Sequence, residues 1–381
     1  MDLRIEMMER LAKRESLVSL CREYGISRKT GEKFKARFKQ RGMNGLEDQS
    51  RAPIVIPHRT PPEVVALIVA ERRAHPSWGP KKLKVTLEKR FERPFPAVST
   101  MGDILVRHGL VVRRKRRMPG TYGPTVLREA KAPNEIWCVD YKGQFKLGDK
   151  SLCYPLTITD QCTRLILGCE GMAAISGEEA REVFEEVFRR YGLPDWMRSD
   201  NGAPFASTGL ANLSKLSVYW LMLGIGLERI RPGCPQENGR HERMHRTLKF
   251  ETARPGRSNL LQQQERFDAF VEEFNTVRPH EALQMKVPSD VYTPSPRPYP
   301  AKLAEFTYPD YDDTVRVGRG GKIWITGRSV HISEALAGRD LGVRDLRDGR
   351  LLFAFGELEL GHLHGGTRLV PVVRAVDGPP A

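Results

Sequence analysis

Three acidic residues far apart in the sequence stand where a carboxylate could do chemistry. Asp140 lies inside a β-prone stretch, where a carboxylate is costly unless a partner or a metal ion compensates it. Asp200 precedes an Asn-Gly turn at the end of a short predicted strand, and ligand sites in α/β sheets form outside strand ends. Glu242 falls in the opening turns of a predicted helix that starts at Gly239. Two strand aspartates and one helix glutamate can converge on one point.

Carboxylates gathered in this way indicate divalent-cation chemistry. Three clustered negative charges raise one another's pKa unless cations lie between them. Ligands that offer only oxygen favour Mg²⁺ or Mn²⁺ over zinc. Two such ions activate an attacking oxygen and stabilise a leaving oxygen in a phosphoryl displacement. Taken singly, each acid has a plainer explanation: a buried hydrogen-bond acceptor for Asp140, an ordinary turn for Asp200 and a surface position for Glu242.

The region between residues 135 and 274 predicts the elements that must position these acids. The helix at 178–191 has an apolar face that includes Phe184 and Phe188, which we expect in the core with Trp137. Three strands precede this helix, and strands then alternate with helices, an order typical of an α/β domain with a mixed sheet. We expect strands at 135–145, 152–159, 164–169, 196–199 and 227–231, and helices at 178–191, 210–223, 239–249 and 263–274.

Positive charge is concentrated in the first third of the chain. The 381 residues carry a net charge of +15. Residues 1–132 contain 30 Lys and Arg against 14 Asp and Glu, whereas residues 133–381 contain 32 against 33. Concentrated positive charge indicates a polyanionic partner, and nucleic acid is the usual one. A solvated basic face is the alternative.

The basic N-terminal third predicts two helical units. Gly25 can supply the positive φ of a tight turn between helices, Ile26 is its apolar plug, and Ser27 is an N-cap. In such a helix-turn-helix the second helix enters the major groove, and its first turn meets base edges. A three-helix bundle without a DNA role is the alternative. We expect one unit at 1–45, a linker at 46–60 and a second unit at 61–125; the expected DNA contacts of the first unit are Ser27, Arg28, Lys29, Thr30 and Lys33.

Further basic residues lie outside these two predicted recognition helices. The run Arg113, Arg114, Lys115, Arg116 and Arg117 is either a phosphate contact or a solvated linker. Arg243, Arg246 and Lys249 line the helix of Glu242 and either bind a DNA end or form a solvated face. His241 and His245, four residues apart on that helix, could touch phosphates; nothing is spaced to make them zinc ligands.

Several absences narrow the class of protein. The six cysteines form no CxxC pair, which predicts reduced, mostly core thiols and no zinc site. No apolar run is as long as the roughly 20 residues of a membrane span, and no signal peptide is evident, so we expect a cytoplasmic protein. The ATP-binding motif GxxxxGK[ST] is missing, so we expect that the protein does not use ATP.

After a proline-rich linker at 289–303, short alternating strands predict a small all-β barrel or sandwich at 305–375.

Four ordered motifs resemble the catalytic core shared by bacterial insertion-sequence transposases and retroviral integrases. They are WCVDYK at 137–142, RSDNGAPF at 198–205, PQENGRHERMHRTLK at 235–249 and FNTVRPH at 274–280, the last followed by Leu283 and Pro288. The resemblance covers residues 130–292, and the helical units and the β-domain are also arranged as in such transposases. It implies a ribonuclease-H-like core in which Asp140, Asp200 and Glu242 are the catalytic, metal-binding triad.

The resemblance also implies an activity. A bacterial DNA transposase would bind double-stranded DNA at terminal inverted repeats, hydrolyse a phosphodiester at the element's end and direct the freed 3′-hydroxyl at target DNA. Each active site would use two Mg²⁺ (or Mn²⁺) ions, and no ATP. Pairing of two ends would require a homo-oligomer, associated with the bacterial nucleoid and not with a membrane.

One departure and three alternatives stay open. Between Asp200 and Glu242 lie 41 residues, longer than is usual for this family, and the stretch at 210–223 is expected to absorb the excess. Glu237, after 36 residues, fits the spacing better, but a helix holds a metal ligand more firmly than the turn around Glu237. The retroviral zinc-binding HHCC module has no counterpart, which favours a bacterial transposase over a retroelement-type integrase. A DNA-binding regulator, or a catalytically decayed element protein, is the non-enzymatic alternative.

Overall fold

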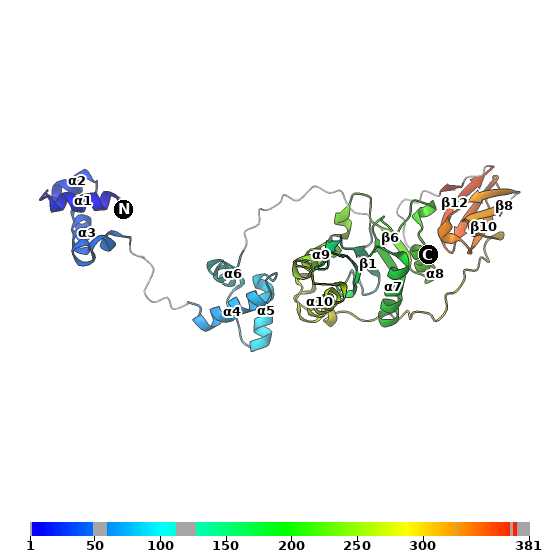
Figure 1. Ribbon diagram of the computed structural model, residues 1–381, viewed down its shortest axis with the longest axis horizontal. Coiled ribbons are helices and arrows are strands. Elements are labelled where there is room, and N and C mark those ends of the chain that lie inside the picture. Colours follow the sequence, from blue (N-terminus) through cyan, green and yellow to red (C-terminus); the bar gives the residue numbers. More distant parts are fainter. Residues whose placement is uncertain (1, 49–58, 112–126, 326, 366–368, 372–381) are drawn as a thin grey trace. The chain divides into compact units, whose positions relative to one another are not determined.

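The computed structural model describes residues 2–48, 59–111, 127–325, 327–365 and 369–371 (Figure 1). The chain divides into two units, Met1–Pro61 and Pro62–Ala381. Within the described ranges, no helix combines the length and the apolar character that a membrane span requires.

The first unit is a small helical bundle whose turns follow from its sequence. Ser27 begins the third helix, and its side chain accepts a hydrogen bond from the Thr30 amide at 3.2 Å, as an N-cap should. Gly25 has a φ of +64°, the left-handed turn that the sequence predicts. A Cβ at Gly31 would lie 2.3 Å from the Cys21 sulfur, so only glycine lets these helices pack this closely. The helices are α1 (Asp2–Ala12), α2 (Leu17–Glu23) and α3 (Arg28–Arg41), followed by the 3-10 turn η1 (Gly42–Leu46).

The second unit begins with three more helices that share a core of their own. Trp78, Ile68 and Met101 are fully buried at its centre, and Leu83 and Leu87 repeat at helical spacing against them. Pro80 stands in the first turn of its helix, where its missing N–H costs nothing. These helices are α4 (Pro62–Ala74), α5 (Pro80–Phe91) and α6 (Val98–Arg107). Both helical groups predicted from the basic N-terminal third are therefore present.

A six-stranded mixed sheet forms the centre of the second unit. Strand β1 lies between β3, with which it is antiparallel, and β5, with which it is parallel. Strand β6 continues the sheet parallel to β5, and β4 pairs antiparallel with β3 on the other side. The strands are β1 (Ile136–Tyr141), β2 (Phe145–Lys146), β3 (Leu152–Asp160), β4 (Ile166–Met172), β5 (Trp196–Ser199) and β6 (Gly226–Arg229). The α/β core with a mixed sheet is thus confirmed.

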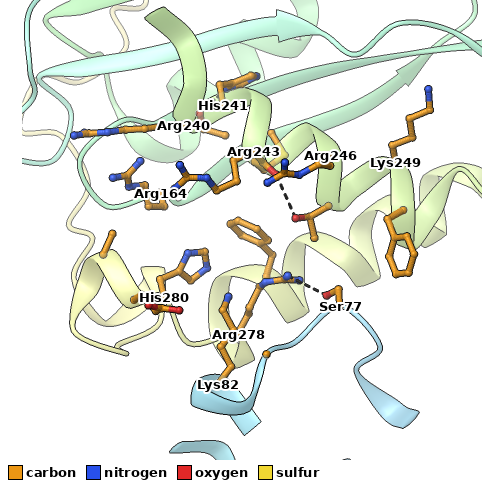
Figure 2. A pocket seen from close by; sticks show the side chains of 18 of the residues that line it. Ser77, Lys82, Arg164, Arg240, His241, Arg243, Arg246, Lys249, Arg278 and His280 are labelled. Carbon is orange, nitrogen blue, oxygen red and sulfur yellow. Dashed lines mark hydrogen bonds between the residues drawn. The ribbon is translucent and has the colours of Figure 1, made fainter. Parts of the chain in front are cut away.

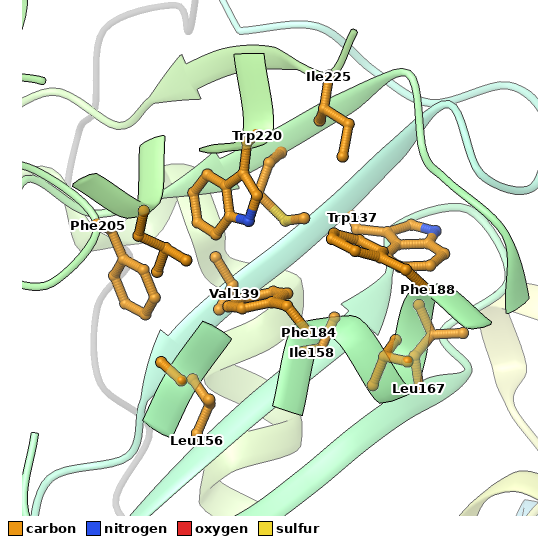
Figure 3. Packing of buried hydrophobic residues seen from close by; sticks show 14 of the residues in the cluster. Trp137, Val139, Leu156, Ile158, Leu167, Phe184, Phe188, Phe205, Trp220 and Ile225 are labelled. Carbon is orange, nitrogen blue, oxygen red and sulfur yellow. The ribbon is translucent and has the colours of Figure 1, made fainter. Parts of the chain in front are cut away.

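Because successive side chains of β1 point to opposite faces of the sheet, they face two different layers of helices. Trp137 and Val139 face α7 (Gly177–Tyr191) and α8 (Lys215–Met222), where Figure 3 shows them packed among Phe184, Phe188 and Trp220. Asp140, one position further along, therefore points to the opposite face. That face is covered by α9 (Gly239–Thr252) and α10 (Leu260–Glu272), which pack on β3 and β4 through a second core.

Several predicted element boundaries differ from the structure. The strand predicted at 135–145 ends at Tyr141, the strand predicted at 164–169 is Ile166–Met172, and the helix predicted at 239–249 runs to Thr252. The predicted helix at 210–223 begins only at Lys215, because the Ser214 side chain caps it there, and residues 210–212 form a 3-10 turn. The predicted helix at 263–274 starts at Leu260, capped by the Asn259 side chain, and gives way to a π-helical turn at Glu273–Val277. The predicted strand at 227–231 ends at Arg229, where its pairing with β5 stops.

A β-rich domain follows the core and shares a helix with it. Its five-stranded antiparallel sheet has the order β13-β12-β11-β10-β7, beside the hairpin β8–β9. Val218 and Met222 of α8 enter its core, whereas Leu216 and Trp220 of the same helix enter the core under the α/β sheet. The strands are β7 (Asp313–Arg316), β8 (Lys322–Ile325), β9 (Arg328–His331), β10 (Asp340–Asp345), β11 (Arg350–Phe355), β12 (Leu358–His364) and β13 (Val370–Pro371).

Candidate active site and basic cleft

The three acids singled out by the sequence line one cavity. Asp140, Asp200 and Glu242 stand on its wall, and its volume is about 340 Å³. Asn201 and the turn at 230–234 complete the lining. Segments 60 and 42 positions apart in sequence are thus brought to one place by the sheet and by α9.

Strand pairing places the two aspartates. Asp140 is near the end of β1, and Asp200 is the first residue after β5, the parallel neighbour of β1. The carboxyl ends of parallel strands lie at the same sheet edge, where ligand sites form. The Asp200 carboxylate accepts a hydrogen bond from the Gly202 amide at 3.0 Å, and the Asn201 side chain donates to the Ile230 carbonyl at 2.6 Å. This turn holds Asp200 beside β6.

Asp140 shows that the three acids influence one another. Burial and, to a smaller extent, the negative charges of Asp200 and Glu242 together raise the pKa of its carboxyl to about 7, against the opposing charge of Lys142. The raised pKa means that holding this carboxyl ionised in the folded protein costs free energy. A bound cation would remove that cost.

The donor set fits a hard divalent cation in chemistry and charge. Three carboxylates supply only oxygen, which is what Mg²⁺ and Mn²⁺ prefer. Among the residues that the structure describes, no group of three or more His, Cys, Asp or Glu is close enough together to hold a metal ion. Asp140, Asp200 and Glu242 are the residues that would hold it, without a preformed three-ligand geometry.

The two candidate glutamates have different surroundings. Glu242 lies in the first turn of α9 and lines the cavity. Glu237 lies in the 3-10 turn η3 (Pro235–Asn238), where its carboxylate is paired with Arg231 at 2.5 Å and also accepts the Arg231 amide at 2.7 Å. Glu237 therefore fastens the turn after β6, and Glu242 is free to face the two aspartates.

The two histidines of α9 point into the protein. His241 and His245 are 2% and 3% exposed, and their ring nitrogens hydrogen-bond the hydroxyls of Thr157 and Thr159 on β3. Contact with DNA phosphates, which the sequence left open for them, is therefore wrong. Periodicity carries a signal for this outcome, because positions 241, 244, 245, 248 and 252 all fall on the buried face of one helix.

A larger, basic cleft lies on the other side of α9. Its volume is about 1110 Å³, and Arg243, Arg246 and Lys249 line it, as Figure 2 shows. The acids on its wall are Asp160 and Glu281. The sequence did not predict six further basic residues on its wall, which come from α9 and the residues just after it, from the β3–β4 turn and from segments distant in sequence: Arg240, Arg254, Arg164, Arg72, Lys82 and Arg278.

Burial and the crowding of positive charge in the basic cleft lower the pKa of two side chains. Burial and, after it, the nearby charge of Arg278 lower the pKa of Lys82 to about 8. Burial also lowers the pKa of Arg164 to about 10, with Arg240 and Arg243 contributing. Like charges held this close favour an anionic ligand, since its charge would relieve their repulsion.

Arg278 braces three segments of the core from the wall of this cleft. It is 6% exposed, and its guanidinium donates to the carboxylate of Glu251 and to the hydroxyl of Ser77, each at 3.0 Å. The Ser77 hydroxyl in turn bonds the same carboxylate. These bonds join α9 and the end of α10 to the loop before α5.

The predicted contacts of the first unit lie at the start of α3. Lys29 and Lys33 are exposed, and Arg28 pairs with Glu32 on the helix surface at 3.0 Å. Ser27 and Thr30 bond to each other across the cap at 2.9 Å. The predicted basic run at 113–117 lies outside the described residues.

Comparison with known families finds two matches across this core. Residues 130–233 match a family described as Integrase core domain, and residues 223–288 match a second family with the same description. Residues 3–54 match a Helix-turn-helix domain family, and residues 30–105 match a Homeodomain-like domain family.

Curated relatives come from a mobile element and from viruses. The insertion element IS407 uncharacterized 31.7 kDa protein of Burkholderia multivorans is 27% identical over 188 residues, which cover 48% of this chain and 64% of that protein. The Gag-Pol polyprotein of feline leukemia virus is 30% identical over 128 residues, covering 34% of this chain and 7% of the polyprotein. The chain thus spans less than two thirds of the length of these relatives.

Two of the solved structures that align with this chain are viral. The HTLV-2 integrase catalytic core domain, solved in complex with magnesium, aligns at 15% identity and a TM-score of 0.34, over 43% of this chain and 99% of that one. A simian T-cell lymphotropic virus intasome aligns at 16% identity and a TM-score of 0.38, over 78% of this chain and 99% of that one. The family matches show that residues 130–288 are similar to the Integrase core domain and that residues 3–105 ahead of them are similar to helix-turn-helix and homeodomain-like domains.

Proposed function

We propose that the protein is a DNA transposase that binds the terminal inverted repeats of its element and carries out strand cleavage and strand transfer. The observation that carries the proposal is the convergence of Asp140, Asp200 and Glu242 on one cavity within an integrase core. Helix-turn-helix domains and a basic cleft beside that cavity supply the means to hold DNA.

The proposed chemistry has two displacements at phosphorus. Water first attacks a phosphodiester at the element's end and releases a 3′-hydroxyl; that hydroxyl then attacks target DNA and displaces another 3′ oxygen. One phosphodiester replaces another in the second step, so no nucleotide is consumed. Asp140, Asp200 and Glu242 would hold two Mg²⁺ or Mn²⁺ ions, which supply activation of the attacking oxygen and stabilisation of the leaving oxygen.

The proposed DNA contacts lie in two places. In the first unit they are Ser27, Arg28, Lys29, Thr30 and Lys33, at the start of a helix that follows a helix-turn-helix turn. In the second unit they are Arg243, Arg246 and Lys249, which line the basic cleft next to the acids. The first group would select the sequence of the repeat, and the second would hold backbone phosphates near the cavity.

The test is cleavage and joining of a labelled duplex that carries the element's own end. We expect products with Mg²⁺ or Mn²⁺, none in EDTA, and no effect of ATP. Asp140→Asn and Asp200→Asn should each abolish both reactions while leaving DNA-end binding in a mobility-shift assay unchanged, because neither residue lies in a helical unit. Undiminished cleavage by either variant would remove that residue from the site.

Two alternatives give different results in the same test. A DNA-binding regulator or a decayed element protein would bind the ends and cleave nothing under any metal condition. A retroelement-type integrase would cleave, but its gene would not be flanked by short inverted repeats. Retention of acids at all three positions favours an active enzyme over a decayed one.

A further inference from the structure

A buried polar cluster lies directly behind the acidic cavity. It consists of Thr157 and Thr159 on β3 and of His241 and His245 on α9, and none of the four is more than 6% exposed. Burying four polar side chains between a helix and a sheet is costly unless each is hydrogen-bonded. Apolar residues would fill the same space at lower cost, so the cluster requires another explanation.

The register of the strand pairing places this cluster beside Asp140. On the antiparallel pair β1–β3, Asp140 lies opposite Thr157, and Cys138 lies opposite Thr159. Alternate residues share a face, so both threonines stand on the α9 side of the sheet beside Asp140. His241 and His245 are four residues apart on α9 and therefore lie one turn apart above them.

The distances connect the four side chains in a line that ends at the carboxylate. Thr159 Oγ1 is 2.8 Å from His241 Nδ1, and His241 Nε2 is 2.8 Å from Thr157 Oγ1. Thr157 Oγ1 is 2.6 Å from His245 Nε2, and His245 Nδ1 is 3.5 Å from Asp140 Oδ2. We call Thr159, His241, Thr157 and His245, in this order, the histidine–threonine chain.

The rules for hydrogen-bond donors and acceptors fix the direction in which protons are donated along the histidine–threonine chain. His241 and His245 are 2% and 3% exposed, and a buried imidazole avoids the cost of a charge by staying neutral, so each ring carries one N–H. While Asp140 is ionised, its carboxylate only accepts hydrogen bonds, so the proton of His245 belongs on Nδ1 and its Nε2 accepts the Thr157 hydroxyl proton. Thr157 then accepts from His241 Nε2–H, and His241 Nδ1 accepts the Thr159 proton. Every buried group is satisfied in this arrangement.

A competing arrangement exists and has a different signature. The Thr157 hydroxyl is also 3.0 Å from the Asp140 carbonyl oxygen and can donate there instead. Both histidines would then donate to Thr157 from Nε2, and His245 would present the lone pair of Nδ1 to the Asp140 carboxylate. Two acceptors would face each other, which is unfavourable while that carboxylate is ionised.

We propose that His245 is a positioning residue for Asp140: its Nδ1–H orients one carboxylate oxygen, and Thr157, His241 and Thr159 fix its tautomer. This inference rests on the proposed function, in which the other oxygen of Asp140 faces a divalent cation. Groups that orient a metal ligand from behind change metal affinity by about 10–100-fold when they are removed. The cluster is therefore retained because it serves the acid next to it.

Mn²⁺ binding to the metal-free full-length protein tests the proposal without any reaction. His245→Leu should weaken Mn²⁺ binding by about 10–100-fold, measured from the signal of free Mn²⁺ in electron paramagnetic resonance. His245→Asn keeps an N–H near the place of Nδ1, whereas His245→Gln places its amide near Nε2. Asparagine should therefore restore most of the affinity and glutamine little. Met244→Leu, buried on the same helix, is the matched control and should bind like the wild type.

A second measurement uses the unaltered protein, so that a folding defect in a variant cannot decide the result. With ¹⁵N-labelled histidine, long-range ¹⁵N–¹H spectra distinguish the two neutral tautomers, and His241→Gln and His245→Asn assign the two signals. We expect the proton on Nδ1 in His245 and on Nε2 in His241. A proton on Nε2 in His245 would overturn the proposal.

The outcomes separate this inference from the proposed function. Unchanged Mn²⁺ affinity in a folded His245→Leu, or better rescue by glutamine than by asparagine, overturns the positioning role and leaves the transposase proposal intact. If the wild-type protein binds no Mn²⁺, the proposed metal site fails. The tautomers of His241 and His245 then decide alone whether the histidine–threonine chain donates toward Asp140.

Discussion

The acidic cavity and the basic cleft lie on two sides of α9. Their opposite charges suit two different tasks: the cavity suits the reaction, and the cleft suits binding of the DNA backbone. The cavity is small and collects three carboxylates from β1, β5 and α9. The cleft has about three times the volume and collects nine Lys and Arg side chains. Glu242 lines the cavity and Arg243, the next residue, lines the cleft, because successive helix positions are about 100° apart. A single element thus sets the distance between the proposed metal site and the proposed DNA backbone site.

Chemistry should depend on the cavity alone, and the two glutamates near α9 test this most strongly. Glu242→Gln should reduce strand cleavage and joining by about a thousandfold or more, because it removes a proposed metal ligand. Glu237→Gln should keep most of both activities, since the Glu237 carboxylate is paired with Arg231 and Glu237 is not among the described residues that line the cavity. Assays on the labelled end duplex compare the two. The reverse pattern would move the third ligand to Glu237 and show that spacing is the better guide.

The affinity of the cavity for a divalent metal ion should depend on pH. The raised pKa of Asp140, about 7, means that below pH 7 a metal ion must displace a proton from the folded protein. Mn²⁺ affinity should therefore fall by about tenfold for each pH unit below 7 and level off above it. Titrations from pH 5.5 to 8.5 measure this slope, and Asp140→Asn should reduce it. A flat profile in the wild type would show that Asp140 is ionised throughout.

DNA affinity should depend on the cleft and leave the cavity unaffected. Arg246→Gln removes one proposed phosphate contact, so binding should weaken by about fivefold to tenfold and the salt slope should fall by about 1. Arg189→Gln is the matched control, because Arg189 is exposed on α7, on the opposite face of the sheet. Titrations at several salt concentrations give both quantities. Equal losses in the two variants would make the cleft an ordinary solvated surface.

The sequence predicted the cavity better than the cleft, and the reason is physical. Asp140, Asp200 and Glu242 each have a local signal, from a strand interior, a strand end and a helix start. Three residues of the cleft share a helix face and were also found, but Arg164 and Lys82 lie in segments whose local pattern carries no sign of the other. Their proximity depends on how α5 and the β3–β4 turn pack against α9, which is a tertiary property.

The histidines of α9 mark the limit of local reasoning. Helix periodicity can place both histidines on a buried face, but only the pairing of β1 with β3 shows that Thr157 and Asp140 lie beneath them. The long interval before Glu242 has a similar explanation. It contains α8, whose two apolar faces pack against the α/β sheet and the β-domain.

The smallest expected effect is a gain in stability from removing a charge in the cavity. The folded-state pKa of Asp140 is raised above the ordinary value of 3.8, so ionisation opposes folding, and stability falls as pH rises from about 4 to about 7. In EDTA at pH 8, Asp140→Asn should therefore raise the Tm of the catalytic region by about 2–4 °C, equivalent to about 1 kcal/mol. The gain should shrink at pH 5, where less of the penalty is present.

Measurements with added Mn²⁺ are the control for the comparison of the wild type with Asp140→Asn. The cation should raise the Tm of the wild type, because it binds only the folded cavity, and should raise that of Asp140→Asn less. Differential scanning calorimetry with and without the metal supplies all four values. A lower Tm for Asp140→Asn in EDTA would mean that the carboxylate is already compensated by its neighbours in the metal-free protein. The cavity would then be a structural cluster of satisfied polar groups, and the contrast with the basic cleft would lose its catalytic meaning.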